Sequence, residues 1–438
     1  MSIANRMMPF LKRHVIIIAL LVAYAFVNLY FLYTHPGSIY NDPEYFGEEI
    51  STYGSRDAAL YAKMAWQLLN DGIYGYEYSP NAAGQSNAYV TYGQPFYLAA
   101  IFKTAEVLNT NHLMLYRLAN MMLNLGIVIL IYSIAQRLFR NRWISVIASI
   151  LYMTHIAPLH YFRAALTEIP SIFLLMLSIW IYIIALKKKD FKWHMFFGIV
   201  ASLMLMFRAT PAPMLLFAWF LTVSRYGWKD GIKTGFIWCI GPLITMAPWA
   251  ARNIYHFGHA YLFSNHAGGP LLGGANPFYR VPPEDLVHEA VAKGYNQEQY
   301  AKILIPQGFK EDFALWFSWF TMGKTFWLFF DNNFTPDGLG PYNRYISGTL
   351  RSFFVVQNLF LAGVGLMSAI LTRKHRPVMY LSVLVLIYIA ASNIFLALPR
   401  YGLLIMPLLA IIGAYGIVTL VGFVVGKVKA LRMKNAMQ

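Results

Sequence analysis

Six charged residues stand near the ends of long apolar stretches, where an ionisable side chain is costly unless it meets a partner. They are Arg117, Arg163, Glu168, Arg208, Arg252 and Arg400. Five of the six are arginine, whose planar guanidinium fork suits phosphate better than the point charge of lysine does. The pattern therefore predicts a phosphate-binding ring at the depth of the lipid headgroups. Arg208, in the turn between two short apolar stretches, is expected to meet an anion there.

A carboxylate, Asp57, follows the first apolar stretch within the sequence YGSRDAALYAKMAWQLLNDGIYG at 53–75. Ser55 has the side chain of a helix N-cap, and Asp57 would then lie in the first turn, where the helix dipole favours an anion. Such a carboxylate is held in place rather than freely mobile. It could serve in chemistry or merely stabilise the start of the helix, and the residue pattern leaves both interpretations open.

The elements that must position these residues are membrane spans. Of 438 residues, 58% are apolar and 12% are charged, whereas soluble domains have about 45–50% and about 25%. We predict an all-helical, polytopic integral membrane protein, because ten apolar stretches can each cross or nearly cross a bilayer core of about 30 Å. These stretches are residues 15–33, 113–136, 143–161, 166–186, 193–207, 211–224, 234–250, 350–372, 377–397 and 402–425. The single cysteine, Cys239, excludes disulfide scaffolds, thiolate zinc sites and two-cysteine redox motifs.

Basic residues give the predicted orientation. With a cytoplasmic N-terminus, six short segments face inward: 1–14, 137–142, 187–192, 225–233, 373–376 and 426–438. They hold 20 of the 35 Lys and Arg residues but only 2 of the 19 acids, which is the bias that orients membrane proteins. Both termini are therefore expected in the cytoplasm. The net charge of +16 then reflects membrane orientation and not a nucleic-acid partner.

This orientation divides the chain into five regions. They are a cytoplasmic N-terminus with the first span (1–33), a first outward loop with juxtamembrane helices (34–112), a six-span core (113–250), a second outward loop (251–349) and a three-span C-terminal part with a cytoplasmic tail (350–438). Two partly apolar segments, 88–108 and 317–330, are assigned to the membrane surface, because counting either as a span would export the basic loops.

Several other kinds of chemistry find little support. MGKT at 322–325 lacks the first glycine of a nucleotide-binding loop, and HEAVA at 288–292 lacks the second histidine of a zinc-protease helix. No Gly-x-Ser-x-Gly elbow of a hydrolase is present. His256, His259 and His266 could bind a metal ion together with a loop acid, but their spacing is equally typical of a wet loop, and no metal site is predicted.

Seven strings along the chain resemble the C-type glycosyltransferases (GT-C), which take a sugar from a polyprenyl-phosphate carrier. Relatives in that superfamily include protein O-mannosyltransferases, aminoarabinose transferases and bacterial lipopolysaccharide sugar transferases. The strings are RDAALYAKMAWQLLNDG (56–72), YRLANMMLN…AQRLF (116–139), ALTEIP (165–170), MFRATP (206–211), PWAARNIYHFG (248–258), GGANP (273–277) and PRYGLLIMP (399–407).

The resemblance implies roles for individual residues. Asp57 matches the first-loop acid that acts as general base on the acceptor hydroxyl, although many relatives carry a second acid where this chain has Arg56 or Ala58. Glu168 matches a second acid that helps to hold the acceptor or assists Asp57. The leaving phosphate needs cations rather than a protonating acid, and the candidates are Arg252, Arg400 and Arg208, followed by Arg117 and Arg163.

The expected activity is thus inverting transfer of a single sugar from a polyprenyl-phosphate donor to a hydroxyl of a lipid A, lipopolysaccharide, other glycan or protein acceptor. No cofactor is required, and membrane lipids are the remaining partners. Short loops and modest length favour a bacterial inner membrane with the site facing the periplasm. A flippase of lipid-linked sugar, a polymerase or ligase of diphosphate-linked glycans, and a non-catalytic scaffold remain as rival interpretations; a flippase would be expected to show two similar halves, which this sequence lacks.

Overall fold

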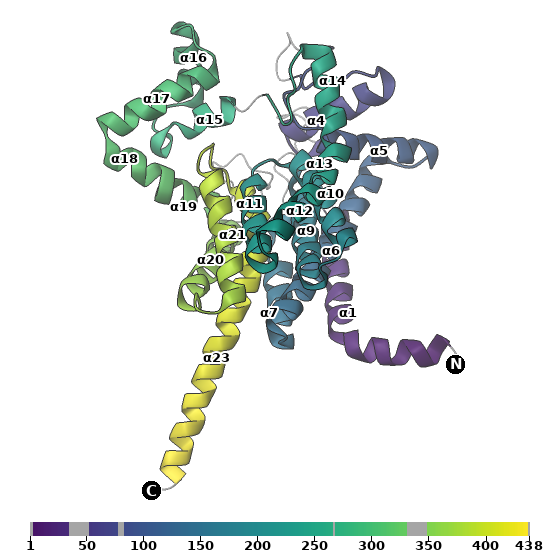
Figure 1. Ribbon diagram of the computed structural model, residues 1–438, viewed down its shortest axis with the longest axis vertical. Coiled ribbons are helices and arrows are strands. Elements are labelled where there is room, and N and C mark those ends of the chain that lie inside the picture. Colours follow the sequence, from purple (N-terminus) through teal and green to yellow (C-terminus); the bar gives the residue numbers. More distant parts are fainter. Residues whose placement is uncertain (1–2, 35–51, 78–82, 266–267, 331–347, 437–438) are drawn as a thin grey trace.

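The computed structural model describes residues 3–34, 52–77, 83–265, 268–330 and 348–436, and in this part of the chain the regular elements are all helices. The long helices pack side by side into an elongated bundle (Figure 1). Its helices are α1 (Ile3–Thr34), α6 (His112–Phe139), α7 (Arg142–Met153), α9 (Glu168–Lys188), α10 (Phe191–Phe207), α11 (Ala212–Tyr226), α12 (Trp228–Trp238), α13 (Ile240–Thr245), α20 (Gly348–Leu371), α21 (Arg376–Ser392) and α23 (Met406–Ala436).

Shorter helices lie mainly at one end of this bundle, the upper end in Figure 1, while both chain termini lie toward the opposite end. The shorter helices are α4 (Arg56–Asn70), α5 (Gly93–Val107), α8 (Ala157–Tyr161), α14 (Ala247–Phe257), α15 (Gly268–Gly274), α16 (Pro283–Ala292), α17 (Gln297–Glu311), α18 (Phe313–Ser318), α19 (Lys324–Phe329) and α22 (Pro399–Gly402). Helix α5 runs across the end of the bundle rather than along it.

Within the described residues, four helical stretches have the length and hydropathy to cross a membrane: residues 15–33 of α1, α6, α9 and the continuous run Pro399–Met433. A fifth is formed if Trp228–Thr245 and Ala247–Phe257, which meet at a bend of 49°, count as one broken span. The other apolar helices of the bundle are shorter. The total of ten spans therefore stays a prediction.

Two of the expected spans are interrupted. The stretch 143–161 forms α7, which ends at Met153, and then the separate helix α8. The stretch 234–250 forms parts of α12, α13 and α14, with the bend before Ala247. Apolar composition identifies the length of a membrane segment but does not show where its backbone breaks.

Two tight helical hairpins at the lower end of the bundle share one local design. Arg140 and Lys189, which terminate α6 and α9, have left-handed φ values of 51° and 54°. In each case the next residue, Asn141 or Asp190, caps the following helix by accepting a hydrogen bond from a backbone N–H. A left-handed residue ends a helix and an Asx side chain starts another, so the chain reverses within two residues.

A buried polar network fastens α1 to the bundle. The side-chain amide of Asn124, in α6, donates to Tyr24 and Asn28 of α1 at 3.0 and 2.9 Å, and its oxygen accepts from Tyr152 of α7 at 3.0 Å. All four side chains are buried in the main hydrophobic core. Hydrogen bonds between apolar helices in this way fix their register, because few other polar partners are available there.

Candidate active site

Helix α4 positions Asp57 as the sequence predicted. The Oγ atom of Ser55 accepts a hydrogen bond from the backbone N–H of Ala58 at 3.1 Å, so Ser55 is the N-cap and Asp57 lies in the first turn. The preceding residue, Gly54, has a left-handed φ of 95° and lies directly against Ala164, where a Cβ atom would be only 2.9 Å from the Ala164 side chain. A glycine is therefore required at this turn.

This turn ties α4 to the segment that leads into α9. The backbone N–H of Ala165 donates to the carbonyl of Tyr53 at 3.0 Å. Two buried side chains of α6 hold the same segment from below: Tyr116 donates to the carbonyl of Ala164 at 2.9 Å, and Asn120 donates to that of Phe162 at 3.1 Å. The start of α9 is thereby fixed next to the start of α4.

Two carboxylates and two arginines meet at this junction. A terminal nitrogen of Arg400 lies 2.7 Å from Oδ2 of Asp57, and a terminal nitrogen of Arg208 lies 2.5 Å from Oε1 of Glu168. The Nε atom of Arg400 is also 4.0 Å from Oε1 of Glu168, which links the two pairs. These four residues, here called the carboxylate–arginine cluster, come from α4, the start of α9, the residue after α10, and α22.

The two arginines are held by further contacts. Arg208 donates through Nε to the hydroxyl of Thr167 at 3.0 Å. Both guanidinium groups lie over the ring of Tyr401, at 5.0 Å for Arg208 and 5.5 Å for Arg400, in cation–π contact. Close packing keeps α22 in place, because a Cβ atom on Gly402 would lie 2.1 Å from the carbonyl oxygen of Leu328.

Exposure distinguishes the two carboxylates. The side chain of Glu168 is 2% exposed and that of its partner Arg208 is 11% exposed, whereas Asp57 is 35% exposed and Arg400 26%. The Glu168–Arg208 pair is thus buried, and removing either charge would leave the other uncompensated. Asp57 can be reached by a substrate, and its arginine is also partly open.

The ionisation of Asp57 follows from its neighbours. Burial by itself would raise the pKa of Asp57, but the charge and the hydrogen bond of Arg400 outweigh it and bring the pKa below its ordinary value. The hydroxyl of Tyr76 adds to this effect by donating to Oδ1 at 3.1 Å. Asp57 is therefore a carboxylate at neutral pH, able to accept a proton.

Arg252 lies outside the cluster and supports it indirectly. Its guanidinium donates to the backbone carbonyls of Asn87 at 2.9 Å and Tyr74 at 3.2 Å, and it packs against the ring of Trp249 at 5.1 Å. The side chain of Asn87 in turn bonds both backbone groups of Tyr76, the residue that donates to Asp57. Arg252 thus stabilises the loop that carries Tyr76 through its hydrogen bonds to the backbone.

Arg117 and Arg163 form a second basic pair. Arg117 donates to the carbonyl of Thr52 at 3.3 Å. Arg163 precedes α9, and burial together with the nearby charge of Arg117 lowers the pKa of Arg163 to about 9, which still leaves it charged at neutral pH. The structure therefore brings together Asp57, Glu168, Arg208 and Arg400, but it leaves Arg117, Arg163 and Arg252 in other surroundings.

Three neighbours of the cluster are not among the residues predicted from the sequence. Tyr61 is partly buried and interacts electrostatically with all four members of the cluster. Its spacing of four residues after Asp57 on one helix is a signal that could have found it. Thr167 and Tyr401 adjoin Glu168 and Arg400 in the chain, but nothing in their type predicts that they contact Arg208.

Metal ligands do not gather in the part of the chain that the structure describes: no group of three or more His, Cys, Asp or Glu side chains there could hold a metal ion. Of the histidines considered as ligands, His256 and His259 are described, whereas His266 lies outside the described residues. The polar groups that the structure describes at the site are carboxylates, guanidinium groups and hydroxyls. An open carboxylate beside an arginine fork can accept a proton and stabilise an anionic leaving group.

Known proteins resemble this chain in sequence and in fold. A model of the family described as dolichyl-phosphate-mannose-protein mannosyltransferase matches residues 94–253. No curated protein sequence matches the chain. Solved structures with a similar fold include the archaeal oligosaccharyltransferase AglB from Archaeoglobus fulgidus in complex with an inhibitory peptide and a dolichol-phosphate, at 12% identity and a TM-score of 0.54.

That comparison covers 97% of this chain and 52% of the archaeal one. The apo form of the Archaeoglobus fulgidus oligosaccharyltransferase gives 13% identity and a TM-score of 0.53, covering 96% of this chain and 52% of the other. The same enzyme tethered to an acceptor peptide with an NVT sequon gives 13% identity and a TM-score of 0.54, covering 94% of this chain and 50% of the other. The chain thus spans about half the length of these structures, and at such identities the likeness concerns the fold alone.

Proposed function

We propose that this chain is a glycosyltransferase of the GT-C superfamily, which it resembles in sequence and in fold, and that it moves a single sugar from a polyprenyl-phosphate carrier to an acceptor hydroxyl. The observation that supports this most directly is the contact between Asp57 and Arg400. It combines a partly exposed carboxylate, suited to an acceptor hydroxyl, with a partly exposed cation, suited to a phosphate.

In the proposed reaction the acceptor oxygen attacks the anomeric carbon of the donor sugar. The bond between that carbon and the phosphate oxygen breaks, so the configuration inverts and polyprenyl phosphate leaves with the electron pair. Asp57 takes the proton of the acceptor hydroxyl, and the guanidinium of Arg400 meets the charge that develops on the phosphate. The proton later passes to solvent.

The geometry couples donor binding to the basicity of Asp57. In the structure Arg400 lowers the pKa of Asp57, which makes the carboxylate a weak base. A donor phosphate that attracts Arg400 would reduce this effect, and the pKa of Asp57 would rise toward the range in which a general base is efficient. Without the donor, Asp57 is thus paired with Arg400, and it becomes a stronger base when the donor is bound.

Glu168 and Arg208 have a supporting role in this scheme. Their pair is nearly inaccessible to solvent, and Glu168 lies 4.0 Å from the Nε atom of Arg400. In this scheme the charge of Glu168 attracts Arg400 from the buried side, and the terminal nitrogen of Arg400 that bonds Asp57 exchanges that partner for the donor phosphate. Arg117 and Arg163 remain candidates for a second anionic group of donor or acceptor.

The acceptor is proposed to approach from the periplasmic side of a bacterial inner membrane, where charge bias places the end that carries the cluster. Lipid A, lipopolysaccharide, another glycan and protein hydroxyls fit the chemistry equally. Neither a metal ion nor another cofactor is needed in this scheme.

The test is incubation of the purified full chain with a panel of undecaprenyl-phosphate monosaccharides and candidate acceptors, followed by mass spectrometry. The expected product is an acceptor heavier by one sugar residue. Transfer of whole oligosaccharides from a diphosphate carrier would instead support a ligase or polymerase. Movement of the donor between leaflets with no new product mass would support a flippase.

A further inference from the structure

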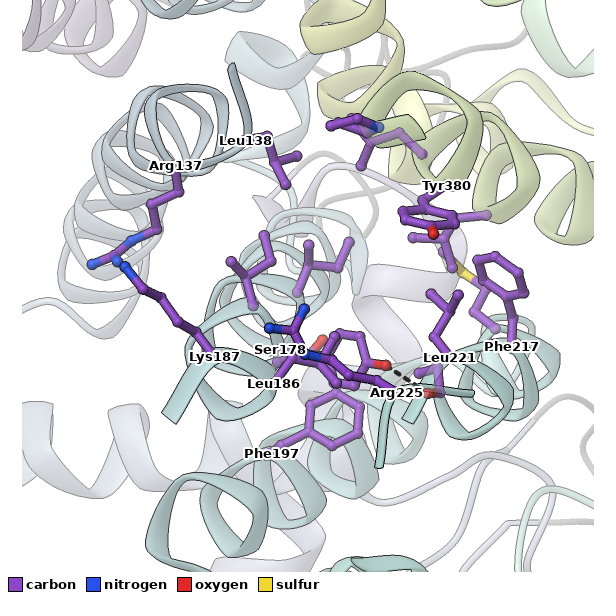
Figure 2. Close-up of a pocket in the computed structure, with 18 of the residues that line it drawn as sticks. Arg137, Leu138, Ser178, Leu186, Lys187, Phe197, Phe217, Leu221, Arg225 and Tyr380 are labelled. Carbon is purple, nitrogen blue, oxygen red and sulfur yellow. Dashed lines mark hydrogen bonds between the residues drawn. The ribbon is translucent and has the colours of Figure 1, made fainter. Parts of the chain in front are cut away.

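A cavity of about 870 Å³ lies between α6, α9, α10, α11 and α21 (Figure 2), away from the carboxylate–arginine cluster. Helix α9 relates the two sites: Glu168 is its first residue, whereas Lys187, at the cavity, lies in its last turn. At a rise of 1.5 Å per residue these two positions are about 28 Å apart. The volume falls within the range of about 300–1,000 Å³ that is usual for ligand sites.

Five basic side chains line this cavity, and all five residues are exposed: Arg137, Arg140, Lys187, Arg225 and Arg376. Figure 2 shows Arg137 and Lys187 on one side and Arg225 nearer the centre. No Asp or Glu is among the lining residues, and within the described residues none of the five has a salt-bridge partner. The cavity therefore carries positive charge that the neighbouring protein does not neutralise.

These five residues belong to four of the segments whose basic residues predict one membrane side, namely 137–142, 187–192, 225–233 and 373–376. They stand at helix ends: three helices, α6, α9 and α11, finish at the cavity and α21 begins there. Segments far apart in sequence thus converge around one opening at the basic end of the bundle.

Below this basic rim the walls are apolar. Leu175, Ile179, Met204, Met214 and Leu384 line the interior. Along α9 the lining runs from Lys187 to Leu175, which corresponds to about 18 Å of depth. Several polar side chains in the lining are bonded to protein atoms: Ser178 donates to the carbonyl of Leu175, and Tyr182 donates to that of Ala218.

We propose that this cavity binds an anionic glycerophospholipid of the adjacent leaflet, with its phosphate at the basic rim and its acyl chains along the apolar walls. The charge selects an anion, and the deep apolar interior selects a long hydrocarbon chain over a soluble phosphate. A polyprenyl-phosphate donor is a poorer occupant, because its phosphate would lie about 28 Å from Glu168. This site goes beyond the glycosyl transfer proposed above and does not depend on it.

The experiment measures lipid retention by the purified full chain. The protein is exchanged into a neutral detergent and titrated with phosphatidylglycerol, with phosphatidylcholine and with undecaprenyl phosphate, and bound lipid is counted by native mass spectrometry. The expected result is saturable binding of phosphatidylglycerol, little binding of phosphatidylcholine, and no displacement of phosphatidylglycerol by undecaprenyl phosphate at equal concentration.

A charge-matched pair of variants locates the binding. The first variant combines Arg137→Gln, Arg225→Gln and Arg376→Gln. The second combines Lys192→Gln, Lys229→Gln and Lys233→Gln, which remove three charges from the basic segments 187–192 and 225–233 outside the cavity lining. Since each basic residue contributes about tenfold or somewhat less to anionic-lipid binding, the first variant is expected to bind on the order of a hundredfold more weakly. The second should bind nearly as the unchanged protein does.

A third variant tests the apolar walls while keeping every charge. Leu221→Trp adds bulk in the cavity and should reduce phosphatidylglycerol binding without changing the count of basic residues. Equal loss in the two charge variants would overturn the proposal, because it would show general attraction to the basic end. Displacement by undecaprenyl phosphate would also overturn it and would assign the cavity to the polyprenyl carrier.

Discussion

The arginines at the two ends of the bundle differ in whether a carboxylate of the chain pairs with them. At the upper end Arg208 and Arg400 each meet a carboxylate within 2.7 Å. At the lower end Arg137, Arg225 and Arg376 line a cavity whose walls contain no acid. In the first case the countercharge belongs to the chain, and in the second case it must come from outside.

This difference bears on what each end can do. A cation paired with a carboxylate can exchange its partner when a phosphate arrives, and the released carboxylate then gains basicity. A cation without an internal partner binds an anion without changing the ionisation of any neighbouring acid. The paired end is therefore suited to chemistry, and the unpaired end is suited to binding. The predictions below test this contrast.

The largest effect is expected from Asp57→Asn. The amide cannot accept the acceptor proton, so the transfer rate should fall by about 10²–10⁴-fold while the helical content and lipid binding at the lower end persist. Single-turnover product formation by mass spectrometry measures it. Asp71→Asn is the matched control, because Asp71 is an exposed carboxylate at the other end of α4. A variant at position 57 that kept the unchanged rate would remove Asp57 from the mechanism.

The next effect concerns stability at the buried pair. Glu168→Gln leaves Arg208 charged, with an exposed fraction of only 11%, and breaking a buried ion pair in this way typically costs about 3–5 kcal/mol. Thermal unfolding in detergent should show a clearly lower midpoint. Glu106→Gln serves for comparison, because Glu106 pairs with Lys103 at the surface, where loss of the pair costs at most about 1 kcal/mol. Similar midpoints for both variants would contradict a structural role for the Glu168–Arg208 pair.

A smaller effect on rate is expected from Arg252→Gln. The substitution removes the hydrogen bonds to Asn87 and Tyr74, and the loop that carries Tyr76 should lose its fixed position. Because misplacement near a reacting group lowers turnover more than binding, kcat should fall by about tenfold to a hundredfold with little change in KM for the donor. A rise in KM at constant kcat would instead indicate direct contact between Arg252 and the donor phosphate.

The sequence identified the members of the cluster but not their pairing. Position beside apolar stretches selected Glu168, Arg208 and Arg400 together with three other arginines, and the family resemblance selected Asp57. The choice of Arg400 as the partner of Asp57 depends on packing between segments 343 residues apart, for which periodicity carries no information. The same limit explains why Arg252 was predicted to bind phosphate: its position after a span resembles that of Arg400, although it donates hydrogen bonds to loop carbonyls.

For the fold as well, the sequence predicted some features and not others. Charge bias predicted that six basic segments share one side of the membrane, and the structure brings four of these segments to one cavity. The break between α7 and α8 after Met153 was not predicted, because residues 143–161 are apolar on average, although Thr154, His155 and Pro158 stand at the break. The cavity itself arises where five helices fail to fill the space between them, and this depends on side-chain shapes across several helices.

The smallest effect concerns pH and the exposed ion pair. Arg400 holds the pKa of Asp57 below the ordinary value of 3.8, so the pair stabilises the folded protein above that pH and ceases to do so as the pH falls through the lowered pKa. Solvent screening limits this contribution to about 1 kcal/mol or less, because the side chain of Asp57 is 35% exposed. The unfolding midpoints of the unchanged protein and of Asp57→Asn should therefore differ by a constant amount from about pH 7 to about pH 5, and converge below about pH 4. An unchanged protein that was less stable than Asp57→Asn at neutral pH, and approached it on acidification, would mean that the carboxylate is destabilised in the folded state. Asp57 would then resemble the unneutralised cations at the lower end more than its own neighbours.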